Sequence, residues 1–382
     1  MTVEFASAAY VQDEARPVLP PPPSQRGAVA WLRGNLFSSP FNGALTLFTL
    51  YLAYVTLPGL AGFLVFDAVW TGSDRKACIA ADGQATGACW PFIWAKLGYF
   101  IYGAYPIDER WRANLFFAGG LAGIVWMLWL DAPRRALGAI YFFLLFPVAA
   151  FVLLAGWPAI GLKTVETSLW GGILVTLIVS LVGIVVSVPL GILLALGRRS
   201  SLPVVRFASI AFIEFVRGVP LISLLFMANA MLPLFLSGSM HPDRLLRPLV
   251  AVALFASAYM AEVIRGGLQA IPKGQYEGAM SLGLGYWQTM YFIVLPQAMR
   301  LVIPGIVNTF IGLFKDTTLV SIVGIFDLLK TVEASVSDPA WSTPVTRYTG
   351  YAFAALFYFA CCFGMSRYSQ SIERRIANGQ QR

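Results

Sequence analysis

The sequence predicts an all-α protein that crosses a membrane about eight times. Of its 382 residues, 58% are hydrophobic and only 12% are charged, and the mean hydropathy is +0.71. Soluble globular chains carry about 25% charged residues. The apolar residues also gather in stretches close to the ~20 residues that a helix needs to cross the hydrocarbon core. These observations together indicate a polytopic membrane protein.

The net charge of +8 needs a different explanation here from the one it would have in a soluble protein. In a soluble chain it would suggest nucleic-acid binding. In a membrane protein, basic residues accumulate in the loops on the cytoplasmic side. We therefore expect lipid, and no nucleic acid, around this chain.

Eight charge-poor stretches are the expected spans, and they are 41–66, 113–130, 136–162, 170–196, 219–236, 248–265, 301–326 and 348–366. With eight spans and both termini in the cytoplasm, the pairs Arg134–Arg135 and Arg198–Arg199 face the cytoplasm, as the positive-inside rule requires. A ninth apolar stretch, 90–106, is broken by Lys96 and rich in aromatic residues. A ninth span would place Arg134 outside, so we interpret this stretch as an interfacial helix on the outer face; insertion into the membrane remains the alternative.

The spans divide the chain into four parts. Residues 1–40 are expected to be a disordered cytoplasmic tail, since they lack the pattern of a signal peptide and include the run Pro20–Pro23. Residues 41–165 form an extension with three spans and a periplasmic loop. Residues 166–370 form a five-span core, and 371–382 a cytoplasmic tail.

Two of the four cysteines, Cys78 and Cys89, lie in the loop assigned to the periplasm. An oxidising compartment favours a disulfide between them over two free thiols. Cys361 and Cys362 are adjacent in the last span, where cysteine usually serves as a small apolar residue.

The sequence lacks the groups that an enzyme of this kind would need. Its one histidine is His241, and no metal-binding spacing or G-x-x-x-x-G-K-[ST] phosphate loop occurs. We therefore expect no enzymatic activity, no metal and no cofactor on this chain. Active transport would need an ion gradient or a partner protein as its energy source.

The loop after the sixth span carries a distinctive spacing. Residues 277–296 read E-G-A, three residues, G, nine residues, I-x-L-P. This pattern resembles the EAA loop of ABC importer permeases, with Gly278 in place of the usual first alanine. We expect a short helix over 275–282, a turn at Gly283 and Gly285, and a second helix over 286–299 with a bend at Pro296. The resemblance implies that this loop docks on an ATPase through six residues: Glu277, Gly278, Ala279, Met280, Leu282 and Gly283.

Three further stretches narrow the resemblance. Residues 213–221 read I-E-F-V-R-G-V-P-L, residues 261–267 read A-E-V-I-R-G-G, and residues 313–321 read L-F-K-D-T-T-L-V-S. They are similar to motifs of the polar amino-acid permeases of the histidine/glutamine type. The resemblance covers about 168–375, and the extension looks like that of the M-type subunit of general L-amino acid (Aap) transporters.

This resemblance implies a permease subunit that moves L-amino acids from periplasm to cytoplasm across a bacterial inner membrane by alternating access. The implied partners are a second, homologous permease subunit, two ATPase subunits that hold ATP and Mg²⁺, and a periplasmic amino-acid-binding protein.

Ionisable residues inside membrane spans are costly, so they face a partner group or a water-filled path. Two interpretations of these residues remain open, a substrate path and pairing between helices. The substrate-path candidates are Glu262, Asn308, Thr309, Lys315, Asp316 and Thr317. The candidates for structural ion pairs are Glu214, Arg217 and Arg265, with Arg265 facing Glu214 or Asp316.

Two other functions compete with this hypothesis. A secondary transporter would show inverted repeats and broken helices at the membrane midplane, and no internal repeat is visible. A structural partner subunit would couple to an ATPase without touching substrate. Substitution of Glu262 or Asn308 would separate that case from a substrate path.

Overall fold

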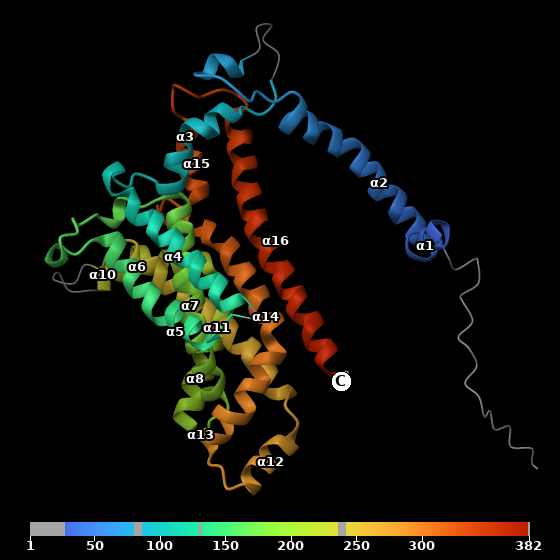
Figure 1. Cartoon of the computed structure of the whole chain (residues 1–382), viewed down its shortest axis with the longest axis vertical. Coiled ribbons are helices and arrows are strands. Elements are labelled where there is room, and N and C mark those ends of the chain that lie inside the picture. Colours follow the sequence, from blue (N-terminus) through green and yellow to red (C-terminus); the bar gives the residue numbers. More distant parts are fainter. Residues whose placement is uncertain (1–26, 80–85, 130–131, 236–241, 381–382) are drawn as a thin grey trace, which may run out of the picture. The chain divides into compact units, whose positions relative to one another are not determined.

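The computed structural model describes residues 27–79, 86–129, 132–235 and 242–380 (Figure 1). The regular structure in these ranges is helical, with a few isolated β-bridges, which confirms the all-α fold. The chain forms two units, Met1–Asp67 and Ala68–Arg382, and each is described by itself. His241 lies outside the described residues.

The first unit is a short helix followed by a long apolar one. Helix α1 spans Gly27–Asn35, so part of the tail expected to be disordered is helical, while residues 1–26 lie outside the description. Helix α2 spans Pro40–Ala61 and continues as a π-helix, Gly62–Phe66. The hydroxyl of Ser39 caps α2 by accepting a hydrogen bond from the Asn42 N–H at 3.1 Å. None of the residues of α2 is buried within this unit.

The second unit contains the remaining helices. They are α3 (Trp90–Tyr102), α4 (Arg110–Leu128), α5 (Arg135–Ile140), α6 (Phe146–Ala155), α7 (Gly172–Arg198), α8 (Pro203–Gly218), α9 (Leu221–Phe226), α10 (Leu232–Phe235), α11 (Leu246–Ala270), α12 (Lys273–Ser281), α13 (Tyr286–Thr289), α14 (Leu295–Asp316), α15 (Leu328–Val336) and α16 (Thr346–Gln380). Short π-helical segments join α5 to α6, α9 to α10 and α13 to α14.

Among the described residues, seven helices are long and apolar enough to cross a membrane, or eight if a bent pair counts as one span. The bent pair consists of α8 and the segment Leu221–Phe235, which meet at 104°. The segment expected as the fifth span, 219–236, therefore forms one arm of a bent helix pair. Helix α14 and its flanking segments extend from Tyr286 to Val323, further toward the N-terminus than expected. Helix α16 continues to Gln380, through most of the expected C-terminal tail.

Close helix contacts make α7, α11 and α14 the centre of this unit. A Cβ atom on Gly191 of α7 would lie 2.7 Å from Met260 of α11. A Cβ atom on Gly267 of α11 would lie 2.8 Å from the Ala298 carbonyl oxygen in α14. The absence of side chains at these two glycines lets the backbones approach. The C-terminal ends of α7 and α11 therefore lie beside the start of α14.

The second unit has two distinct ends. Figure 1 shows α12 and α13 at one end and α3 and α15 at the opposite end. We call the first the loop end and the second the disulfide end. Helix α3 has 13 residues, or about 20 Å, which is short of the ~30 Å hydrocarbon core. The helix expected over 90–106 is thus present but is too short to be a span.

A disulfide joins Cys78 to Cys89, whose Cα atoms are 5.6 Å apart. The Cys89 N–H donates a hydrogen bond of 2.9 Å to the Thr349 hydroxyl of α16. Nearby, Lys96 of α3 pairs with Asp338, and this hydrogen bond lowers the pKa of the Asp338 carboxyl. The loop that contains the disulfide is therefore attached to the last helix of the chain.

We expect a Cys78→Ser/Cys89→Ser variant to lose about 3 kcal/mol of unfolding free energy, since the crosslink closes a short loop of the unfolded chain. The matched control is Cys361→Ser/Cys362→Ser, because both of these thiols are free and should matter little. Peptide mass spectrometry of unreduced protein checks the pairing, and alkylation of Cys78 without reductant would contradict it.

Candidate functional site

Helix α12 ends in a tightly capped turn at the loop end. The Gly283 N–H donates to the Met280 carbonyl at 2.9 Å, and the Leu284 N–H donates to the Ala279 carbonyl at 3.1 Å. This pair of hydrogen bonds is a Schellman motif, which needs a left-handed residue after the helix. Gly283 supplies it with φ of +75°. A side chain at this position would strain the turn even though the space around it is open.

The side chains of α12 divide into one buried contact and an exposed surface. Ala279 is fully buried, whereas Met280 is 63% and Leu282 is 78% exposed. Glu277 is also exposed, and a Cβ atom on Gly278 would meet nothing within 4 Å. The six residues expected to contact an ATPase thus form one short capped helix, with two apolar side chains and a carboxylate open to a partner.

Two details of this loop differ from the sequence expectation. Gly285 has φ of −69°, so the turn needs only one glycine in the left-handed region. The second helix, expected over 286–299, is α13, a π-helical segment (Met290–Val294) and the start of α14. Pro296 lies in the first turn of α14, directly after the π-helical segment.

Polar contacts of two side chains, Tyr276 and Gln275, attach α12 to neighbouring helices. The Arg199 guanidinium donates to the Tyr276 hydroxyl at 3.1 Å and to the Leu268 carbonyl at 3.2 Å, and it lies over the Tyr276 ring. On the other side, Gln297 of α14 donates to the Gln275 side chain at 3.0 Å. A hollow of about 420 Å³ lies beside these contacts, lined by Arg199, Leu268, Gln269, Ile271, Lys273, Tyr276, Glu277 and Met280.

Glu262 of α11 is the centre of an ion cluster. Its carboxylate lies 2.7 Å from Arg265 Nη2, 3.0 Å from Arg198 Nη1 and 3.5 Å from Arg217 Nη1. Arg198 also pairs with Glu214 at 2.7 Å. The Glu262 side chain is only 15% exposed, so its charge depends on these three partners. The cluster joins α7, α8 and α11.

The ion cluster contains both substrate-path candidates and candidates for structural ion pairs. Glu262, a substrate-path candidate, pairs with Arg217 and Arg265, which were candidates for structural pairs. Arg265 faces Glu262 rather than Glu214 or Asp316, because residues three apart on one helix share a face. Arg198 was missed: its place after a span marked it as a basic flank, and no local signal indicates that it turns back toward α11.

The other substrate-path candidates lie along α14 and the turn after it. A Cβ atom on Gly305 of α14 would lie 3.0 Å from Val263, the neighbour of Glu262, and the next turn of α14 holds two of the candidates. These are Asn308, which is exposed, and Thr309, whose hydroxyl donates to the Gly305 carbonyl at 2.9 Å.

The remaining three candidates lie about 10 Å further along α14, at 1.5 Å per residue. Lys315 is exposed, Asp316 is half-buried, and the buried Thr317 hydroxyl donates to the Phe314 carbonyl. The structure therefore does not bring the six candidates together.

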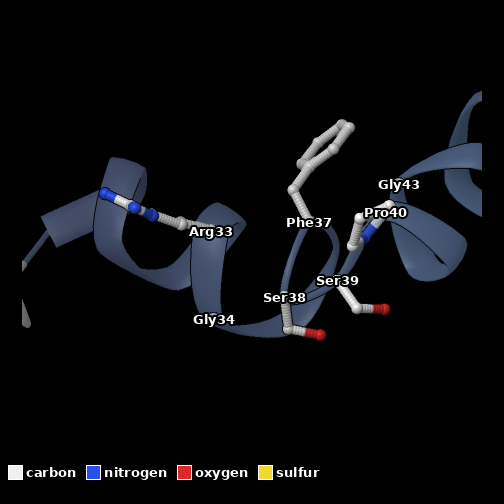
Figure 2. Close-up of a pocket in the computed structure, with 7 residues that line it drawn as sticks. All are labelled: Arg33, Gly34, Phe37, Ser38, Ser39, Pro40 and Gly43. Carbon is white, nitrogen blue, oxygen red and sulfur yellow. The ribbon is translucent and has the colours of Figure 1, made fainter.

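The first unit has a hollow of its own at the corner between α1 and α2. Figure 2 shows Phe37 pointing away from Ser38 and Ser39 there. The hollow is about 620 Å³, and its lining residues are Arg33, Gly34, Phe37, Ser38, Ser39, Pro40 and Gly43. Arg33 is the one charged group in this lining, so the hollow offers no set of groups for chemistry. No group of metal-ligating side chains occurs within the described ranges.

Comparison with known proteins bears on both the loop and the core. Residues 187–378 match the family model described as "Binding-protein-dependent transport system inner membrane component". The chain is 50% identical to the inner membrane amino-acid ABC transporter permease protein YhdY of Escherichia coli, over 94% of this chain and 97% of YhdY. It is 41% identical to the glutamate/glutamine/aspartate/asparagine transport system permease protein BztC of Rhodobacter capsulatus, over 97% and 99% of the two chains.

A solved structure, titled "Crystal structure of an amino acid ABC transporter with histidines", is 30% identical and covers 53% of this chain and 92% of its own, with a TM-score of 0.48. The family model and the two full-length relatives confirm the ABC permease family expected from the sequence. The chain belongs to the binding-protein-dependent transport system inner membrane components.

Proposed function

We propose that this permease subunit imports L-amino acids and that α12 is the helix through which a separate ATPase drives it. The proteins YhdY and BztC, which are similar over nearly their whole length, are named as amino-acid permeases. The observation that carries the coupling role is the capped helix α12, with Met280 and Leu282 exposed. Two exposed apolar side chains on a stubby helix suit a groove on another protein.

The complete transporter, in this proposal, contains a second permease subunit, two ATPase subunits and a periplasmic binding protein. ATP and Mg²⁺ reside on the ATPases, and this chain binds no cofactor. ATP binding draws the ATPases together, moves the two permeases and opens the path outward. Hydrolysis then resets the transporter. Alternating access needs a helix that follows the ATPase, and α12 is a nine-residue helix with Ala279 as its one buried residue.

The proposed orientation places the loop end in the cytoplasm and the disulfide end in the periplasm. Disulfides persist in oxidising compartments, which supports the assignment of the Cys78–Cys89 end. The basic cluster with Arg198 and Arg217 lies toward the opposite end, in line with the positive-inside rule. Both termini are then cytoplasmic.

The substrate path, as proposed, passes Glu262 and Asn308. Glu262 has its carboxylate occupied by three arginines, so its role is to hold those guanidinium groups, which are suited to a substrate carboxylate. Asn308 is exposed on α14 about one turn after Gly305 and offers both a donor and an acceptor. Lys315, Asp316 and Thr317 remain candidates for the more distant part of the path.

Gly283→Val tests the coupling role. Valine is strongly disfavoured at a φ of +75°, so we expect α12 to lose its cap, the ATPase to dissociate and uptake to fall at least tenfold. Co-purification of the ATPase and uptake of labelled amino acids are the measurements. The matched control is Gly278→Ala, which meets open space, restores the usual alanine and should leave both unchanged. Normal ATPase association in Gly283→Val would contradict the proposal.

A further inference from the structure

We infer that Arg199 and Tyr276 are positioning residues that make the end of α7 move together with α11 and α12. The inference rests on the proposed function, in which α12 is pulled by an ATPase. It concerns how that movement reaches the ion cluster around Glu262.

The first step is how α12 is held. Among the nine residues of α12, Ala279 is the one that is fully buried, so the helix has little core of its own. It follows α11 directly along the chain, through Ile271 and Pro272. Any force on α12 therefore reaches α11, and with it Glu262, through covalent bonds. The end of α7 does not adjoin α12 along the chain and is held to α11 by apolar packing and by side-chain contacts.

The second step is the contact that brings α7 into the same movement. Tyr276 donates from its hydroxyl to the Leu268 carbonyl of α11 at 3.3 Å and accepts from Arg199 at 3.1 Å. Arg199 also donates to Leu268 directly, and its guanidinium lies 5.6 Å from the centre of the Tyr276 ring. The ends of α7 and α11 and the first turn of α12 thus meet at one tyrosine.

The third step is the contact that Arg198, the neighbour of Arg199, makes with the ion cluster. Arg198 binds both Glu262 and Glu214 through the same nitrogen, Nη1. Consecutive residues at the end of a helix point about 100° apart, so the two arginines can contact different neighbours. Arg199 faces α12 while Arg198 faces the cluster. If α11 moved and α7 did not, Arg198 would separate from Glu262.

The other polar attachment of α12 provides a contrast. Gln297 connects Gln275 to α14, and its second hydrogen bond goes to the Ile293 carbonyl nearby in the same chain segment. This contact holds α12 but leads to no charged residue of the cluster. Loss of the Gln297 contact should loosen α12 without separating α7 from α11.

The test uses the complete transporter, with both permeases, ATPase and binding protein, reconstituted in liposomes. The measured quantity is the number of ATP molecules hydrolysed per labelled amino acid imported. We expect Tyr276→Phe and Arg199→Lys each to raise this ratio at least threefold while the ATPase still co-purifies. The double variant should raise the ratio by less than the two single variants together, because the two residues share the Arg199–Tyr276 hydrogen bond. Arg199 is exposed, so these variants should insert and fold normally.

Two matched controls complete the experiment. Gln297→Ala breaks the other attachment of α12, and Arg206→Lys alters an exposed arginine of α8; both should keep the wild-type ratio. An unchanged ratio in Tyr276→Phe and Arg199→Lys would overturn the inference, as would an equal rise in Gln297→Ala. A wild-type chain that fails to co-purify with an ATPase would instead refute the proposed function, so the two failures are distinct.

Discussion

Replacement of Glu262 by glutamine is expected to lower the free energy of unfolding by about 3 kcal/mol and to abolish uptake. Glutamine keeps the shape of the side chain but removes the charge that faces Arg198, Arg217 and Arg265. Loss of one partner from a buried ion pair costs about 3–5 kcal/mol, because the remaining charge is left desolvated. The lower value applies here, since the carboxylate is 15% exposed. Thermal unfolding in lipid nanodiscs and uptake of labelled amino acids measure the two effects.

The control for this variant is Glu214→Gln in the same cluster. Glu214 is 55% exposed and has one arginine partner, so we expect a loss under about 1 kcal/mol. Equal losses from Glu262→Gln and Glu214→Gln would show that the cluster is not centred on Glu262.

Asn308→Ala should leave stability unchanged and lower the apparent affinity for substrate, because no described helix depends on its amide.

The second large effect is expected from Arg112→Ala in the N-terminal extension. Arg112 is only 2% exposed, and its Nη2 lies 2.9 Å from Glu109. Its Nη1 donates to the Lys163 carbonyl at 2.7 Å, which ties the start of α4 to the segment that leads into the core. Alanine leaves Glu109 and this carbonyl without their partner, so we expect a loss of about 3–5 kcal/mol.

Denaturation of the lipid-embedded protein is the measurement for Arg112. Arg110→Ala, two residues away, is the matched control. The guanidinium carbon of Arg110 lies 4.9 Å from the centre of the Tyr102 ring. Such a stacked cation contributes roughly 1 kcal/mol. A variant at Arg112 that unfolds within 1 kcal/mol of the wild type would mean that the extension is held by its apolar contacts alone.

The long spans were predictable because each is a continuous apolar run. The helix expected over 170–196 is α7, Gly172–Arg198, within two residues at each end. Helix α8 was missed for the opposite reason: its apolar residues recur at helical spacing between Arg206, Glu214 and Arg217, so no long apolar run marks it. The bend after it lies at Val219, which is extended because it precedes Pro220.

In the candidate sites, too, features with a local cause were predictable and features built from distant residues were not. The α12 turn was predictable from one stretch of sequence, because a glycine after a short helix has a local conformational cause. The ion cluster was not, since its charges come from three helices and helical spacing names only one partner, Arg265 for Glu262. Arg198 lies 64 residues from Glu262, and nothing in the sequence connects the two.

The attachments at the disulfide end also constrain how the protein is made. Lys96 and Cys89 contact Asp338 and Thr349, residues that lie 242 and 260 positions later in the chain. Ribosomes add about 5–20 residues per second, so the early partners wait on the order of tens of seconds for the late ones. During that interval the disulfide end of the nascent chain lacks these two contacts. They form once α16 has been inserted, so a chain truncated before α16 cannot make the contact with Thr349.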